Sequence, residues 1–207
     1  ERRDSPRPST GAVSATRRTA QAGAPTVSWT DAALSEGVRA WRLRVSDAEV
    51  LPPPFAVDTT GEQEAVPEAA DWGESYHLVV SRLLPYKNVD RAIEAFNDLP
   101  DERLVVVGKG PLAAQLRSKA KANSLLLEGI PDAQLRWLYA NATALVAPSH
   151  EDFGLTVVEA AAFGTPALAL RAGGYLDTVE PGLSGYFFSH PKAADIVDAV
   201  HRHRERP

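Results

Sequence analysis

From about residue 76 to the C-terminus, short apolar segments alternate with segments of helical periodicity. A strand that is buried on both faces of a sheet is apolar at every position, and neighbouring parallel strands must be joined by a crossover, which is usually a helix. The alternation therefore predicts an α/β domain whose parallel sheet carries helices on both faces. The predicted strands are residues 78–80, 104–107, 125–127, 144–147, 166–170 and 186–188.

Helices are predicted after each of the first four strands, and turns are predicted between the fifth and the sixth strand. Asn88 is predicted to cap the first of these helices, because a side-chain oxygen at this position can accept from the unpaired N–H groups of the first turn. A last helix is predicted at residues 193–203, where Ile196, Val197 and Val200 share one face.

The N-terminal part of the chain lacks this alternation. Residues 1 to about 28 are rich in Arg, Ser, Thr, Ala and Pro, which predicts disorder or a linker. Residues 28–45 show a weak helical pattern, and we take residues 1–50 together as a disordered or linker segment. The composition leaves two alternatives open, a targeting segment and a weak contact with an anionic membrane surface. Residues 55–75 are acidic and contain proline, which predicts a loop. We divide the chain into the mostly irregular segment at residues 1–50 and a domain at residues 51–207.

Composition argues against several classes of function. The formal net charge is −5, which does not fit a general nucleic-acid binder. The chain has no cysteine, and therefore no disulfide, thiolate metal site or cysteine nucleophile. Its histidines show no metal-ligand spacing, and we predict neither a metal ion nor a cofactor. No apolar run approaches the roughly 20 residues that cross a bilayer, and the expected location is cytoplasmic.

Residues 151–159 carry the strongest functional signal. Glu151 and Glu159 flank a turn at Gly154 that leads into a predicted helix. A helix N-terminus suits a phosphate, because it offers unpaired N–H groups and the positive end of the helix dipole. Carboxylates on either side could hold hydroxyl groups, and this layout fits a sugar nucleotide. The dipole alone explains Glu151 adequately. It explains Glu159 poorly, because an unpaired carboxylate among apolar neighbours is costly, and ribose hydroxyls are its predicted partners.

Two cations follow the first predicted strand. Arg82 offers a fork of donors suited to phosphate, and Lys87 offers a mobile point charge near a helix N-terminus. Because the carboxyl ends of parallel strands meet at one edge of a sheet, both could reach the same ligand as Glu151. The alternative is a solvated loop with two ordinary surface cations.

Weaker signals follow the second and third strands. Gly108 begins a Gly-Lys-Gly turn that either lets the backbone approach a ligand or simply permits a tight turn. Gly129 and Ile130 follow the third strand. They either contact a nucleobase or end the strand with a core isoleucine.

Several segments, in the same order, resemble the motifs of glycosyltransferase family four, which comprises retaining nucleotide-sugar glycosyltransferases of the GT-B fold. The similarity spans about residues 50 to 200. The sequence of residues 86–96 is most similar to the O-antigen mannosyltransferase-like branch. The matching segments are residues 81–83, 86–90, 107–111, 151–159, 163–166 and 172–174.

The resemblance implies a Rossmann-like sheet that binds the donor, the second of the two domains in this family. It implies that Arg82 and Lys87 bind the donor diphosphate and stabilise charge on the leaving group, and that Glu151 faces the transferred sugar. Glu159 would hold the ribose, and Gly129 and Ile130 would lie against the base. The implied donor-binding residues are Gly108, Gly129, Ile130, Phe153, Gly154, Leu155, Thr156 and Glu159.

The family's first domain, which binds the acceptor, has no recognisable counterpart, because the roughly 75 residues before the first predicted strand lack strand–helix repeats. Residues 1–50 could be its remnant. We therefore predict the donor half of a glycosyltransferase that moves a hexosyl group from a UDP- or GDP-sugar to a hydroxyl acceptor on a glycan or lipid. The main alternative is a non-catalytic sugar-nucleotide-binding module completed by another chain. A sugar-nucleotide epimerase is a third.

Overall fold

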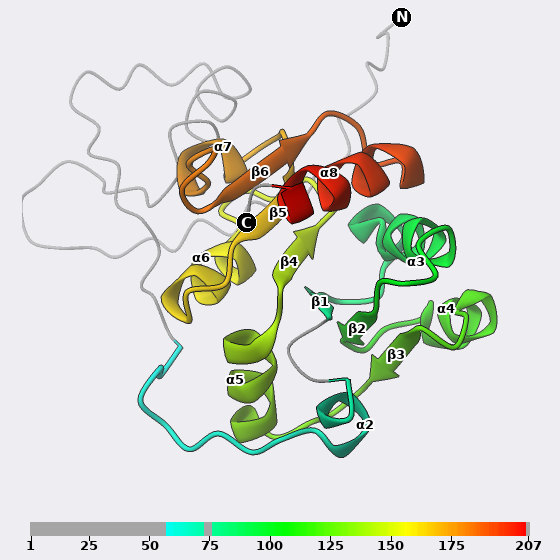
Figure 1. The fold of residues 1–207 in the computed structure, drawn as a ribbon, viewed down its shortest axis with the longest axis vertical. Coiled ribbons are helices and arrows are strands. Elements are labelled where there is room, and N and C mark those ends of the chain that lie inside the picture. The colour runs from blue at the N-terminus through cyan, green and yellow to red at the C-terminus, as the bar shows by residue number, and fades with distance from the viewer. Residues whose placement is uncertain (1–56, 73–75, 206–207) are drawn as a thin grey trace, which may run out of the picture.

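The structure is a computed structural model that describes residues 57–72 and 76–205 (Figure 1). The predicted linker at residues 1–50 and the predicted domain boundary at residue 51 lie outside the described residues. The described part forms a parallel sheet with helices on both faces, which confirms the predicted fold class.

The six strands pair in the order β3-β2-β1-β4-β5-β6, and every pair is parallel. The chain builds outward from β1 to β3 and then returns to place β4 on the other side of β1. The strand order therefore reverses between β1 and β4, and ligands of open α/β sheets bind at such a switch point, beyond the carboxyl ends. The strands are β1 (His77–Val80), β2 (Leu104–Val107), β3 (Ser124–Leu127), β4 (Ala144–Ala147), β5 (Ala167–Leu170) and β6 (Gly185–Phe188).

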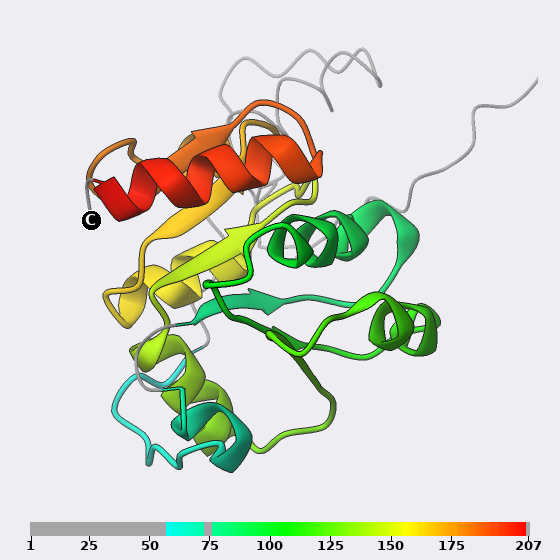
Figure 2. The same ribbon diagram turned by 45° about the vertical axis from the view of Figure 1, so that its right-hand side comes forward.

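The helices divide between the two faces of the sheet (Figures 1 and 2). Helices α3, α4 and α8 pack on one face, and α2, α5, α6 and α7 pack on the other. Their bounds are α2 (Pro67–Ala70), the 3-10 turn η1 (Pro85–Lys87), α3 (Val89–Asn97), α4 (Ala113–Lys119), α5 (Asp132–Asn141), α6 (Leu155–Ala162), α7 (Tyr175–Thr178) and α8 (Ala193–Glu205).

Alternation along each strand builds two separate hydrophobic cores. In β1, Val79 packs under α3 and α8, whereas Leu78 packs under α5 and α6. In β2, Val106 and Val105 divide in the same way. Successive side chains of a strand point to opposite faces, so a strand between two helical layers must be apolar at every position. This requirement explains why the apolar runs predicted the sheet.

Part of the predicted loop at residues 55–75 has regular structure. Pro67 begins the short helix α2, and Val66 is buried against α5. The Glu64 N–H donates to the carbonyl of Ala133 on α5 at 3.1 Å. The segment has only a weak helical pattern of its own, and composition alone therefore indicated a loop. Burial of its apolar side chains against the rest of the domain stabilises the helix.

His77, at the start of β1, is buried, and neither of its ring nitrogens has a hydrogen-bond partner among the described residues. The ring packs on Phe96 at a centroid distance of 5.1 Å, and Nδ1 lies 3.7 Å from Glu102 Oε2. Burial, with a smaller contribution from the charge of His203, lowers the pKa of His77 from 6.5 to about 4. The folded chain therefore favours the neutral ring.

We expect the free energy of unfolding to fall by about 2 kcal/mol between about pH 7.5 and pH 5 because of His77. The unfolded chain binds a proton on this side chain below its ordinary pKa of 6.5, whereas the folded chain does so only near pH 4, so stability is lost as the pH falls. Urea unfolding at the two pH values measures the change. His77→Leu should remove most of it, and an unaltered pH dependence in this variant would contradict the assignment.

Candidate functional site

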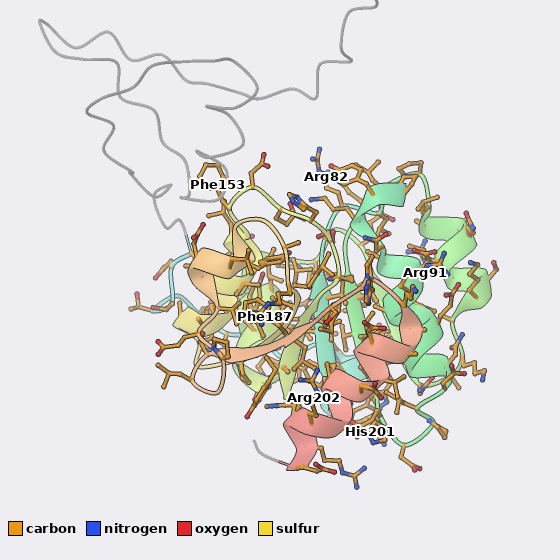
Figure 3. The ribbon with its side chains drawn as sticks, turned by 90° about the horizontal axis from the view of Figure 1, so that it is seen from above. Arg82, Arg91, Phe153, Phe187, His201 and Arg202 are labelled. Carbon is orange, nitrogen blue, oxygen red and sulfur yellow. The ribbon has the colours of Figure 1, made fainter. Side chains whose placement is uncertain are left out.

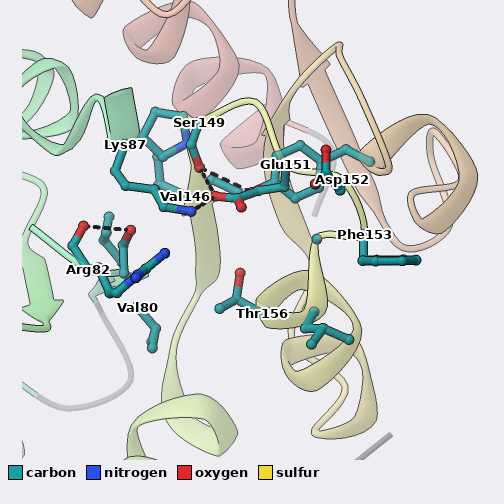
Figure 4. Close-up of a pocket in the computed structure, with 16 residues that line it drawn as sticks. Val80, Arg82, Lys87, Val146, Ser149, Glu151, Asp152, Phe153 and Thr156 are labelled. Atoms are coloured by element: carbon teal, nitrogen blue, oxygen red, sulfur yellow. Dashed lines mark hydrogen bonds and ion pairs between the residues drawn. The ribbon is translucent and has the colours of Figure 1, made fainter. Parts of the chain in front are cut away.

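A cavity of about 300 Å³ opens at the switch point between β1 and β4 (Figure 4). Val80 and Val146, near the carboxyl ends of these strands, form part of its wall. Figure 3 shows Arg82 at this end of the domain, whereas Arg202 of α8 lies near the opposite end. The predicted site residues that line the cavity are Arg82, Lys87, Glu151, Phe153, Gly154, Leu155 and Thr156.

Lys87 is a buried cation of the cavity wall. It ends the turn η1, with 9% of the residue exposed, and its Nζ lies 2.5 Å from Glu151 Oε1. The next residue, Asn88, has the left-handed conformation (φ 54°), and its side-chain amide donates to the Pro148 carbonyl at 3.0 Å. This bond ties the loop after β1 to the loop after β4. Asn88 therefore does not cap α3 with its side chain, as predicted, because the amide bonds a different loop.

Glu151 accepts two hydrogen bonds on one oxygen. Its Oε1 accepts from Lys87 Nζ and from Ser149 Oγ, each at 2.5 Å. The Ser149 oxygen also lies 3.5 Å from the Tyr175 hydroxyl. Burial raises the pKa of Tyr175, so the phenol stays neutral. These contacts fix the carboxylate beside the ammonium group of Lys87 in the wall of the cavity.

The N-terminus of α6 forms the wall opposite the cations. Gly154 precedes the helix with a φ of 73°, and a Cβ at this position would lie 2.5 Å from the Tyr175 ring. Only glycine meets both demands without strain. No side chain caps α6, and its first residues, Leu155 and Thr156, line the cavity. An uncapped helix N-terminus directs N–H groups to its surroundings and favours an anion.

Arg82 is the exposed cation of the site. Its guanidinium donates to the Tyr86 hydroxyl at 3.2 Å, and the Tyr86 ring lies 5.0 Å from Lys87 Nζ. In Figure 4, Arg82 and Lys87 lie on the β1 side of the cavity, and Thr156 lies on the α6 side. The structure thus brings the two predicted cations and the predicted helix N-terminus around one cavity.

Four predicted site residues lie outside this cavity, and three of them follow β2 or β3. Gly108 follows β2, and a side chain there would overlap the carbonyl oxygen of Ser81, so the approach of the loop after β1 is sufficient reason for this glycine. Gly129 is exposed, and Ile130 is half-buried against the core under α5 and α6. Their contacts with a donor stay predictions.

Glu159 also lies outside the lining of the cavity, on the second turn of α6. It is half-buried, and its Oε2 accepts from the Tyr139 hydroxyl at 2.8 Å. Its apolar neighbours along the chain predicted a carboxylate without a partner in the protein. A tyrosine from α5 provides a partner within the protein, so ribose hydroxyls are not required to explain the position of Glu159.

Sequence reasoning missed Ser149, Tyr175 and Tyr139. Ser149 lies two residues after the end of β4, and its position beyond a strand end was an available signal. No local sequence pattern identifies Tyr175 or Tyr139 as a site residue. The Tyr139 hydroxyl meets Glu159, and the Tyr175 hydroxyl meets Ser149, only because separate segments of the chain pack together.

Residues 57–72 and 76–205 show neither a membrane-spanning helix nor a metal-binding cluster. None of the helices in these ranges has both the length and the apolar character that a membrane span requires. No group of three or more histidine or carboxylate side chains in these ranges is arranged to hold a metal ion.

The sheet and its helices have the architecture of one domain of a GT-B glycosyltransferase. The sequence profile described as Glycosyl transferases group 1 matches residues 62–205, which include the whole cavity. The chain belongs to this family, as its resemblance to glycosyltransferase family four predicted.

Curated relatives include three kinds of glycosyltransferase. A GDP-mannose-dependent alpha-(1-6)-phosphatidylinositol dimannoside mannosyltransferase of Mycobacterium tuberculosis is 35% identical over 137 residues, 60% of this chain and 36% of that protein. A glycogen synthase of Pseudomonas aeruginosa is 31% identical, over 60% of this chain and 26% of that protein. A D-inositol 3-phosphate glycosyltransferase of Acidothermus cellulolyticus is 32% identical, over 60% and 32%. The chain thus spans about a third of the length of these relatives.

Solved structures share the fold at lower identity. A sucrose-phosphate synthase of Thermosynechococcus elongatus superposes with a TM-score of 0.70 and 22% identity, over 87% of this chain and 49% of that chain. HepE of Anabaena, solved in complex with UDP and glucose, superposes with a TM-score of 0.63 and 20% identity, over 76% and 47%.

Proposed function

We propose that this domain binds a UDP- or GDP-sugar and that the whole protein transfers the hexosyl group to a hydroxyl acceptor. The observation that carries this proposal is the cavity in which Arg82 and Lys87 face the uncapped N-terminus of α6. Two cations and a helix N-terminus around one cavity suit a diphosphate. The family membership of the chain supports the same conclusion.

In this proposal the diphosphate lies between the two cations and the N–H groups of α6. The bond between the anomeric carbon and the leaving phosphate oxygen breaks, the electron pair leaves with that oxygen, and Arg82 and Lys87 stabilise the charge that develops. The acceptor oxygen attacks the same face of the sugar and gives its proton to the departing phosphate, which retains the configuration. Glu151 accepts from hydroxyls of the transferred sugar.

The remaining predicted residues hold the rest of the donor. Glu159 follows the phosphate-binding turn by one helical turn, which puts it within reach of a ribose attached to the diphosphate. We assign the base to the edge formed by Gly108, Gly129 and Ile130. The residues of the turn that contact sugar and phosphates are Phe153, Gly154, Leu155 and Thr156.

The proposal needs no metal ion or other cofactor, because Arg82, Lys87 and the helix N-terminus supply the positive charge that a metal would otherwise supply. The acceptor is a glycan or lipid-linked hydroxyl, held by a further domain or by a partner chain. GDP-mannose is the first donor to test, since one relative is named as dependent on it. A cytoplasmic location, and a weak contact of residues 1–50 with a membrane surface, stay predictions.

A second candidate is a sugar-nucleotide-binding module without transfer activity. One observation favours it: two cations and a helix N-terminus around one cavity suit binding of a diphosphate whether or not transfer follows.

We expect GDP-mannose or UDP-glucose, but not mannose or glucose alone, to raise the melting temperature of the 207-residue chain, because a ligand that binds only the folded state stabilises it. Titration calorimetry then gives the affinity, and addition of EDTA should leave it unchanged. Absence of saturable binding by GDP-, UDP- and ADP-sugars would disprove the proposal.

Acceptor-dependent release of nucleoside diphosphate distinguishes a transferase from a binding module, and an epimerised sugar would indicate an epimerase.

A further inference from the structure

Contacts fix both the ring and the backbone of Tyr139. It lies on α5 with 1% of its surface exposed, and its ring stacks on Phe163 at a centroid distance of 5.7 Å and an interplanar angle of 5°. The Thr165 hydroxyl donates to the Tyr139 carbonyl at 2.5 Å. A ring fixed by stacking and a backbone fixed by a side-chain hydrogen bond leave the Tyr139 hydroxyl little freedom to move.

The hydroxyl of Tyr139 is a donor to a charged group. It lies 2.8 Å from Glu159 Oε2 and donates a hydrogen bond to this carboxylate oxygen. Burial and the negative charge of Glu159 both raise the pKa of Tyr139. The phenol thus stays protonated and donates to the carboxylate, and hydrogen bonds to an ionised acceptor are stronger than neutral ones.

The helix α6 places Glu159 next to the proposed phosphate site. Glu159 follows Leu155 by four residues and Thr156 by three, and residues at these spacings share one face of a helix. Leu155 and Thr156 line the cavity. The carboxylate therefore lies one helical turn, about 5 Å, beyond the cavity along the same face. In the proposed donor pose, the ribose extends from the diphosphate in this direction.

We propose that Tyr139 is a positioning residue of the donor site: it fixes the rotation of the Glu159 carboxylate so that the carboxylate accepts from the vicinal hydroxyls of a ribose. Without the tyrosine the carboxylate could rotate, and ordering it would oppose binding. Tyr139 thereby makes binding selective for ribonucleotides. The inference rests on the proposed donor-binding function.

The test compares ligands that differ only in the ribose hydroxyls. Affinities of the full chain for GDP and UDP, and for their 2′,3′-dideoxy forms, are measured by titration calorimetry. We expect the dideoxy nucleotides to bind the native chain at least tenfold more weakly, the size of a lost charge-assisted hydrogen bond. Tyr139→Phe should weaken binding of the ribonucleotide about tenfold and leave that of the dideoxy nucleotide unchanged.

Tyr76→Phe is the matched control. Tyr76 is also fully buried, and its hydroxyl donates to the Leu138 carbonyl on the same helix α5 at 3.0 Å. A purely structural loss should change the affinities for both nucleotide forms alike, in either variant. Equal weakening of both forms by Tyr139→Phe, or no weakening of either, would overturn the inference while leaving the proposed function intact. If the native chain bound neither GDP nor UDP, both would fail.

Glu159→Asp gives a second test that does not depend on the folding of the tyrosine variant. The side chain is one methylene shorter, so the carboxylate cannot both accept from Tyr139 and occupy its native position. We expect a ribose-selective loss of about tenfold here as well. Native affinity for the ribonucleotide in Glu159→Asp would contradict the need for a fixed carboxylate.

Discussion

Lys87→Ala is expected to weaken binding of a nucleoside diphosphate by about 3 kcal/mol, or roughly 100-fold. The variant loses a nearly buried cation, and it also leaves Glu151 without the ammonium group that lies 2.5 Å away. The carboxylate keeps its hydrogen bond from Ser149 but loses its neutralising cation, and it would then repel the phosphates. Titration calorimetry with GDP and UDP measures the loss without any contact to the sugar.

Lys109→Ala is the control for bulk charge. Lys109 follows β2 at the same edge of the sheet but is exposed, and we expect less than about 0.5 kcal/mol of change. Adding Glu151→Gln to Lys87→Ala should recover part of the affinity for the diphosphate, because the unpaired negative charge is removed. If Lys87→Ala and Lys109→Ala had the same small effect, Lys87 would not be a phosphate ligand.

Gly108→Ala should lower the free energy of unfolding by about 3 kcal/mol. The added Cβ would overlap the carbonyl oxygen of Ser81. Neither backbone can yield easily, because the Gly108 N–H donates to Leu127 at 3.0 Å and the Ser81 N–H donates to Val107 at 3.0 Å. Adding the side chain must therefore displace the loop that carries Arg82 from its place after β1. Urea unfolding at neutral pH measures the loss.

Gly164→Ala is a control for the effect of replacing glycine alone. Its φ is 79°, and a Cβ there would meet nothing within 4 Å, so we expect a loss of about 1 kcal/mol from backbone strain alone. Equal losses in the two variants would mean that the contact between Gly108 and Ser81 is not a tight one.

The sheet was predictable from the chain because burial on both faces leaves a local trace. Residues 104–107 and 144–147 were predicted as strands and coincide with β2 and β4. The start of β1 at His77 was not predicted, because this histidine joins the sheet by pairing with Leu104 and Ala144 rather than by its own hydropathy.

The site was predictable only in part. Arg82, Lys87 and Glu151 were grouped because each follows a strand, and parallel strands direct their carboxyl ends to one edge. The ion pair between Lys87 and Glu151 joins residues 64 positions apart, and no local pattern encodes it. The same holds for Asn88, whose contact with the loop after β4 overrides its expected role as a helix cap.

The sequence by itself determined that this chain folds as a helix-covered parallel sheet. It also determined that the polar residues which follow the strands lie at one edge of the sheet, because parallel strands direct their carboxyl ends to the same edge. Only the tertiary structure decided which groups touch: Lys87 with Glu151, and Tyr139 with Glu159. The physical reason is that hydropathy is a property of each segment, whereas a hydrogen bond depends on where two separate segments pack.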